Sequence, residues 1–226
     1  MLTPVINRPV SSRCRSLRPT IALQLWRRAM LILATVAALL AVPGLSLATT
    51  GDGADAFVKL LGNDAIQMLK NKDLTQPQRE AEFRRLFVKG FDVNVISRFA
   101  LGRFWREATE AQRSEYQKLF EDFIVKSYAA RLGQYSGETF SVKDAKAVDA
   151  NDNLVESVIE RPNGPPVRVD WRVRRSDGDF KIVDVIVEGV SMVVTQRQEF
   201  GSVIQNNGGK IDSLLDRLRQ KNAEIK

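Results

Sequence analysis

The spacing of apolar residues changes at Gly137, and this change constrains the fold more than any other feature of the chain. Before Gly137, apolar side chains recur every three or four residues, which predicts helices over 54–70, 75–90, 93–100 and 109–132. After it they alternate, which predicts strands over 139–148, 154–160, 167–174 and 180–188. Helical spacing returns over 191–207 and 211–218. The pattern therefore predicts a single α+β domain.

The four predicted strands are joined by short segments rich in turn residues, such as 149–153 and 162–166. Connections this short join antiparallel neighbours. We therefore expect a curved antiparallel sheet of about four strands packed with helices.

Three helix starts carry capping residues. Thr75 with Gln78, and Thr109 with Gln112, have the spacing of a capping box, in which each side chain bonds a free backbone N–H of the first turn. Asp92 is placed to cap the helix over 93–100.

Residues 1–48 differ in composition from the rest of the chain. They hold six arginines and no acidic residue, and the uncharged stretch 29–42 follows Arg27-Arg28. Ser46 and Ala48 occupy the small-residue positions of a cleavage site. We therefore predict a signal peptide over 1–48, cleaved after Ala48, and a mature domain over 49–226 in the periplasm. The alternative is an uncleaved anchor, since residues 29–48 are long enough to span a bilayer.

Charge and composition exclude several classes of function. The net charge of +7 comes from the first 48 residues, because the remaining chain has 28 basic and 27 acidic residues. That balance argues against nucleic-acid binding. The chain has no histidine, and its one cysteine is Cys14, so the mature domain has no Ser-His-Asp or Cys-His catalysis, ordinary zinc site or disulfide. No calcium loop or phosphate-binding loop is present, and we predict no metal and no cofactor.

The fourth predicted strand is apolar on both faces. Strict alternation places Val183, Val185 and Val187 on one face, and Phe180, Ile182 and Ile186 on the other. An antiparallel strand usually has one polar face. Either helices cover both faces, or one face lines a ligand cavity. Asp184 lies within this strand and needs a donor if buried; a structural salt bridge and a catalytic carboxylate are the two interpretations.

The third predicted strand alternates strictly between valine or tryptophan and charged residues. Arg168, Arg172, Arg174 and Arg175 form a basic ridge on its polar face. The ridge is either a solvated face or a docking surface for an anionic partner or a lipid headgroup layer. Trp105 and Trp171 fit either a core or a ligand site, and Phe104-Trp105-Arg106 could line the mouth of a cavity.

Several segments together resemble the toluene-tolerance auxiliary family, which includes the MlaC-type periplasmic phospholipid carriers. The similar segments are Arg98-Phe99-Ala100-Leu101-Gly102-Arg103-Phe104-Trp105, Val169-Asp170-Trp171-Arg172-Val173, Gly178-Asp179-Phe180-Lys181-Ile182-Val183-Asp184-Val185 and Glu188-Gly189-Val190-Ser191-Met192. The resemblance covers about 54–221. It implies an NTF2-like or cystatin-like fold whose curved sheet and helices enclose an apolar cavity for acyl chains. Asn206-Asn207-Gly208-Gly209 is similar to the hopanoid-associated branch of the family.

The resemblance also implies a function without catalysis. Such a carrier shuttles phospholipid between an outer-membrane lipoprotein–porin complex and an inner-membrane ABC transporter carrying an MCE-domain protein, and so maintains outer-membrane lipid asymmetry. One alternative is a carrier for hopanoid or another isoprenoid lipid. Another is a small-molecule enzyme on an NTF2-like fold, using Asp184 with a tyrosine.

The predicted site residues follow from these interpretations. No catalytic residue is assigned, and partner or headgroup docking is assigned to Arg168, Arg172 and Arg174. Lipid contact is assigned to apolar and aromatic residues from both halves of the chain: Phe87, Phe99, Phe104, Trp105, Phe123, Tyr128, Val169, Trp171, Val185 and Val187.

Overall fold

The computed structural model describes residues 53–132, 135–176 and 178–225. The predicted signal peptide 1–48 and its cleavage after Ala48 lie outside these residues. Five helices precede the strands: α2 (Ala54–Lys70), α3 (Gln76–Gly90), α4 (Val93–Leu101), α5 (Phe104–Glu107) and α6 (Glu110–Leu132). Five strands follow: β1 (Thr139–Ala147), β2 (Asp152–Glu160), β3 (Val167–Ser176), β4 (Asp179–Val187) and β5 (Val190–Ser191). The last two helices are α7 (Met192–Asn206) and α8 (Ile211–Glu224).

The strands form one sheet in the order β1-β2-β3-β4-β5, with every neighbouring pair antiparallel. This confirms the predicted α+β fold and its meander. The short fifth strand was not predicted. It is added by a two-residue turn in which Glu188 and Gly189 both have left-handed backbone angles, φ 49° and 81°, as a type I′ hairpin requires.

Two bulges interrupt the sheet, one in β1 between Val142 and Asp144 and one between β3 and β4. In the second, Arg172 pairs with Asp184 while Val173 pairs with Ile182, so Val183 is the extra residue. An extra residue reverses which face every following side chain occupies. The predicted division of this strand was therefore wrong. Phe180 and Ile182 share a face with Val185 and Val187, and Val183 does not.

The capping hydrogen bonds predicted for three helix starts are all present. The backbone N–H of Thr75 donates to Gln78 Oε1 at 2.9 Å, and that of Thr109 donates to Gln112 Oε1 at 3.0 Å. The backbone N–H of Val95 donates to Asp92 Oδ1 at 2.9 Å. These bonds satisfy donors that the first turn of a helix leaves free.

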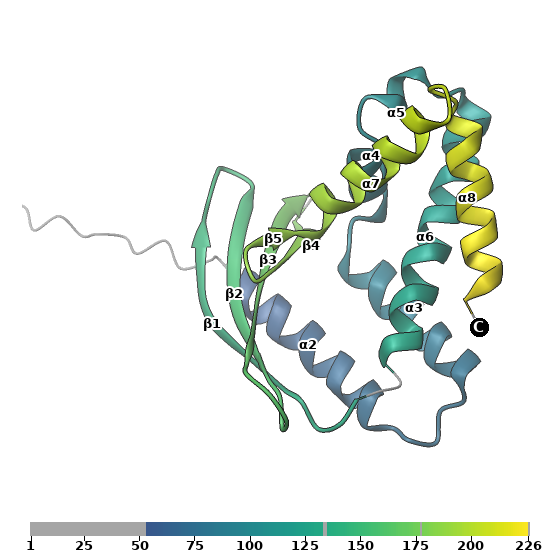
Figure 1. Cartoon of the computed structure of the whole chain (residues 1–226). Helices are drawn as coiled ribbons and strands as arrows, with labels where there is room; N and C mark the ends of the chain where they lie inside the picture. Colours follow the sequence, from purple (N-terminus) through teal and green to yellow (C-terminus); the bar gives the residue numbers. More distant parts are fainter. Residues whose placement is uncertain (1–52, 133–134, 177, 226) are drawn as a thin grey trace, which may run out of the picture. The chain divides into compact units, whose positions relative to one another are not determined.

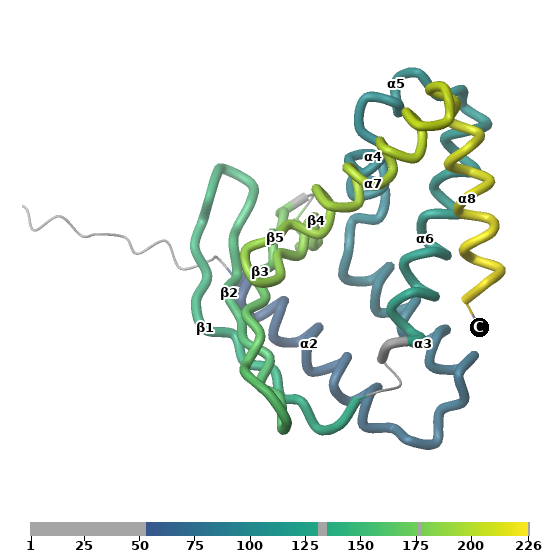
Figure 2. The backbone as a smooth tube through the Cα atoms, viewed as in Figure 1, coloured from purple at the N-terminus to yellow at the C-terminus, as the bar shows by residue number. Residues whose placement is uncertain are grey.

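Most buried apolar side chains in the described part of the chain belong to one of two clusters. In the sheet cluster, Ala54 and Val58 of α2 pack against Val155, Val173 and Ile182. We call the sheet face that α2 covers the inner face. The helical cluster joins α4, α5, α6, α7 and α8 around residues such as Tyr116, Phe120, Phe200 and Leu215. Figure 1 shows α2 lying along the curved sheet, with α6 and α8 in a separate layer. The backbone tube in Figure 2 follows the same two layers.

Candidate functional site

The inner face of the sheet carries two apolar cross-strand pairs next to the sheet cluster. Val169 lies opposite Val187, and Trp171 lies opposite Val185, as the hairpin between the third and fourth predicted strands requires. Val169 is 4% exposed, whereas the other three side chains are only half-buried. Protein atoms therefore leave part of this apolar surface uncovered.

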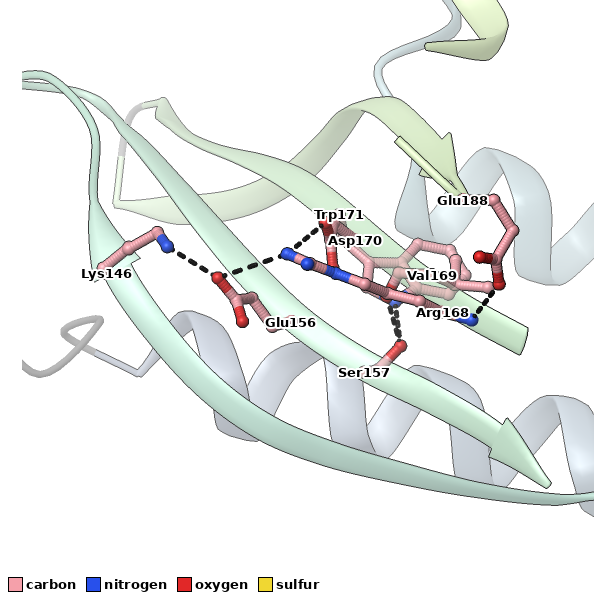
Figure 3. A network of polar contacts seen from close by, with 8 residues as sticks. All are labelled: Lys146, Glu156, Ser157, Arg168, Val169, Asp170, Trp171 and Glu188. Carbon is pink, nitrogen blue, oxygen red and sulfur yellow. Dashed lines mark hydrogen bonds and ion pairs between the residues drawn. The ribbon is translucent and has the colours of Figure 1, made fainter. Parts of the chain in front are cut away.

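Trp171 is held by a short chain of hydrogen bonds (Figure 3). Its indole N–H donates to Ser157 Oγ at 2.9 Å, and the Ser157 hydroxyl donates to the carbonyl oxygen of Val169 at 2.6 Å. Ser157 is 0% exposed. The ring of Phe140 meets the indole edge-on at 6.1 Å between centroids. With its polar atom satisfied, Trp171 presents a fixed apolar ring on the inner face.

An aromatic ladder connects the sheet cluster to the helical layer. It consists of Phe83, Phe87 and Phe91, four residues apart along α3 and the residue after it, and Tyr128 of α6. Ring centroids are 6.2 Å apart between Phe83 and Phe87, 4.9 Å between Phe87 and Phe91, and 6.5 Å between Phe83 and Tyr128. The ladder brings together two predicted lipid-binding residues, Phe87 and Tyr128.

The sheet end of the ladder is anchored to β4. Phe91 forms a parallel bridge with Ile182, and the backbone N–H of Asp92 donates to the carbonyl oxygen of Ile182 at 2.9 Å. Phe91 also packs against the sheet cluster, to which Trp171 and Val185 belong as half-buried members. The inner-face pairs and the ladder therefore form one apolar region. We did not assign Phe83 and Phe91 to it from the sequence, although their four-residue spacing around Phe87 was a usable signal.

The other predicted aromatic residues lie elsewhere. Phe104, Trp105 and Phe123 pack in or against the helical cluster. Phe99, on α4, is 42% exposed. The sequence therefore grouped residues that belong to two parts of the fold, and lipid contact by these four stays a prediction.

The basic ridge of β3 is largely neutralised by carboxylates on the same sheet face. Asp152 is buried and lies 2.7 Å from Arg174 Nε and 3.4 Å from Arg172 Nε. The hydrogen bond that Arg174 donates to Asp152 raises the pKa of the Arg174 guanidinium above its ordinary value. Buried Asp170 lies 2.9 Å from Arg168. This arrangement favours the solvated face, and docking by the ridge stays a prediction.

A further ion pair extends this network along the sheet. Lys146 of β1 lies 2.6 Å from Glu156 of β2, and Arg168 lies 3.5 Å from the same carboxylate oxygen. Figure 3 shows the four side chains of Lys146, Glu156, Arg168 and Asp170 joined in sequence. The hydrogen bond from Lys146 lowers the pKa of Glu156.

Asp184 has a structural role. Its carboxylate accepts a hydrogen bond from the Ser191 hydroxyl at 2.6 Å and another from the backbone N–H of Val193 at 3.2 Å. It therefore caps the first turn of α7. The hydrogen-bond donors for Asp184 come from the N-terminus of α7 and not from a basic side chain, so the predicted salt bridge was wrong.

The chemistry available to the described residues is limited. They contain no group of three or more His, Cys, Asp or Glu side chains that could hold a metal ion. Tyr116 is buried, which raises its pKa, and its hydroxyl donates to the carbonyl oxygen of Ser97 at 3.0 Å. Within the same residues, no helix is both long enough and apolar enough to cross a membrane.

The chain is similar to proteins of one family. The family described as "MlaC protein" matches residues 60–220. A toluene tolerance protein, Ttg2D of Pseudomonas putida, is 27% identical over 50% of this chain and 53% of its own length. The intermembrane phospholipid transport system binding protein MlaC of Haemophilus influenzae is 25% identical over 53% of this chain and 57% of its own length. The chain thus spans about half the length of the curated relatives it matches.

A solved structure has the same fold. It is a phospholipid-binding protein from Ralstonia solanacearum in complex with a phospholipid, 28% identical, with a TM-score of 0.69. The match covers 76% of this chain and 98% of the solved chain.

Proposed function

Because this chain belongs to the MlaC family, we propose that it is a periplasmic phospholipid carrier whose cargo lies along the inner face and the aromatic ladder. The acyl chains would contact Trp171, Val185 and Val187 on one side and Phe83 and Tyr128 on the other, with buried Phe87 stacked against Phe83. The headgroup would remain in water. No catalytic step is part of this function.

The observation that carries the proposal is the separation of the two apolar clusters. Val169 and Phe87 are buried, but the other side chains of the inner-face pairs and the ladder are only partly covered, and neither cluster buries them completely. Half-buried apolar surface of this kind is typical of a ligand site. The phospholipid bound to the structural relative from Ralstonia solanacearum supports a lipid as the ligand.

The hydrophobic effect explains why a carrier of this kind needs partners. Two acyl chains with about 30 methylenes, at roughly 0.8 kcal/mol each, make exposure to water cost on the order of 24 kcal/mol. Unaided release is therefore negligible. Exchange between a bilayer and the protein moves the chains from one apolar environment to another, so its net free energy is small.

The proposed partners follow from family membership. We propose that the protein exchanges lipid with an inner-membrane ABC transporter carrying an MCE-domain protein and with an outer-membrane lipoprotein–porin complex. The chain itself supplies no energy source, so the partners determine the direction of transport.

Mass spectrometry of protein purified without detergent tests the cargo. We expect a stoichiometric two-chain phospholipid, released by organic extraction. A hopanoid or other isoprenoid mass in its place would establish the alternative cargo suggested by Asn206-Asn207-Gly208-Gly209. Protein that is folded and free of lipid after gentle isolation would contradict the carrier function.

Processing of the N-terminus gives a separate prediction. The exported protein should begin at Thr49, because Ser46 and Ala48 form the cleavage site. N-terminal sequencing of the periplasmic fraction measures this directly. An intact N-terminus found in the membrane fraction would establish the uncleaved anchor instead.

A further inference from the structure

A second surface lies where α4 and α5 meet α7, and it combines arginines with aromatic rings. Residues 93–106 contain three arginines and no acidic residue, and α7 adds Arg197. We call this surface the Arg–aromatic patch and define it by Arg98, Arg103, Arg106, Arg197, Phe99 and Trp105. All four arginines are exposed.

Three of the four arginines of the patch lie against rings. The guanidinium carbon of Arg197 is 5.0 Å from the ring centre of Phe99, and that of Arg98 is 5.8 Å from the ring centre of Trp105. A third such contact, 4.8 Å long, joins Arg103 to Phe104. A guanidinium held against a ring keeps its N–H donors available at the edge of its plane.

These arginines also lack acidic partners. Among the described residues, no carboxylate lies within 4.0 Å of a nitrogen of Arg98, Arg103, Arg106 or Arg197. By contrast, Arg84 and Arg219 each have two or more carboxylates within that distance. The chain after residue 48 is nearly neutral as a whole, so the positive charge of the patch is a local excess that favours an anionic ligand.

The surface is hollowed around Gly102. A Cβ atom at this position would lie 2.8 Å from Arg197 Nε, and the backbone φ of +63° also favours glycine. Two adjoining grooves, of about 500 Å³ and 490 Å³, share Phe99, Gly102, Arg103 and Arg197. Each groove is open to solvent and has room for a lipid headgroup.

We propose that the Arg–aromatic patch docks the protein on the anionic phospholipid headgroups of a bilayer. The proposal rests on the proposed function in one respect, since a lipid carrier must meet a lipid surface. Arginines bind phosphate oxygens in a bidentate manner. Phe99 and Val194, 42% and 41% exposed, lie beside them and can enter the boundary between headgroups and acyl chains. Half-buried Trp105 has the amphipathic ring typical of that boundary.

An acidic protein is the competing partner. Arginines without carboxylate partners would suit it equally well. The exposed apolar side chains of Phe99 and Val194 among these arginines favour the headgroup layer, where charged and apolar contacts are available side by side.

The test uses the full chain with one fluorescent probe. In a Cys14→Ser background, Val194→Cys carries an environment-sensitive dye at the edge of the patch. A control chain carries the dye at Val148→Cys, an exposed site between β1 and β2. With vesicles of phosphatidylglycerol and phosphatidylcholine, emission should shift to the blue at position 194 and remain unchanged at position 148. This comparison separates docking by the patch from attachment through residues 1–48.

Matched charge variants complete the experiment. Arg98→Gln with Arg197→Gln should weaken vesicle binding about 25-fold, because each arginine near an anionic surface contributes about five-fold. Arg85→Gln with Arg217→Gln removes the same charge outside the patch and should leave binding unchanged. High salt should weaken docking of the parent chain.

Three results would overturn the proposal: no shift at position 194, an equal shift with pure phosphatidylcholine, or equal losses for the two charge pairs. A shift caused by a polyglutamate peptide and not by vesicles would also overturn it, in favour of an acidic protein partner. Bound phospholipid is extracted from the same proteins. Loss of docking with cargo retained therefore tests the patch alone, whereas absence of cargo concerns the proposed function.

Discussion

Replacing Val185 by Trp is expected to remove bound phospholipid from the protein while leaving it folded. Val185 lies on the inner face opposite Trp171, and both side chains are half-buried. An added indole ring would occupy volume that acyl chains fill under the proposed function, and it would pack beside Trp171 as an aromatic cross-strand pair. We expect at least a ten-fold loss of extractable lipid after reloading. The measurement is lipid extraction beside a thermal melt of the stripped proteins.

The matched control is Ile186→Trp. Ile186 neighbours Val185 on β4 but points to the opposite sheet face, where it pairs with Asp170. Ile186 is also half-buried, so Ile186→Trp should likewise leave the protein folded, and it should leave lipid content unchanged because it lies on the other sheet face. Stripped forms must be compared, because bound ligand itself raises the melting temperature. A Val185→Trp protein that retains its lipid and melts far below the stripped parent would show that this face is ordinary core.

The second large effect concerns the carboxylate of Asp152. Arg174 binds it through two nitrogens, at 2.7 Å and 2.9 Å, and Arg172 approaches it at 3.4 Å. Changing both arginines to Gln leaves a carboxylate that is 3% exposed without a cation. Breaking a buried pair costs about 3–5 kcal/mol, and the partial exposure of the arginines reduces this to about 2–3 kcal/mol. Urea denaturation at neutral pH measures the loss.

A third substitution provides the control. Adding Asp152→Asn to the double variant removes the unpaired negative charge and keeps the shape of the side chain. Most of the lost stability should therefore return. If the triple variant is as unstable as the double variant, the arginines stabilise the sheet by packing and not by charge.

The sequence predicted helix starts well because their chemistry is local. Thr75 and Gln78 lie three residues apart, and the bonds they form involve only their own helix turn. The same is true of Asp92 and of Thr109 with Gln112. Strand positions could be predicted equally well, because the alternation of apolar residues reflects burial of one sheet face.

Features that depend on pairing between distant segments were not predictable. The bulge at Val183 arises from the register between β3 and β4, and it reversed the predicted faces of Phe180 and Ile182. The sequence placed Asp152 in a turn, so its pairing with Arg174, 22 residues away, could not be anticipated. The sequence also could not show that Phe99 and Trp105 lie apart from Trp171. Periodicity identifies the buried face of a helix, but not the element against which that face packs.

The separation of the sheet cluster from the helical cluster bears on how this family can diversify. Side chains that belong to neither cluster can change size without breaking either core, so the apolar region they form can be resized at little risk to folding. Phe83, Tyr128 and Val187 are positions of this kind. Under the proposed function, cargo preference can therefore drift between related chains while the scaffold persists, and one architecture is open to lipids of different length and shape.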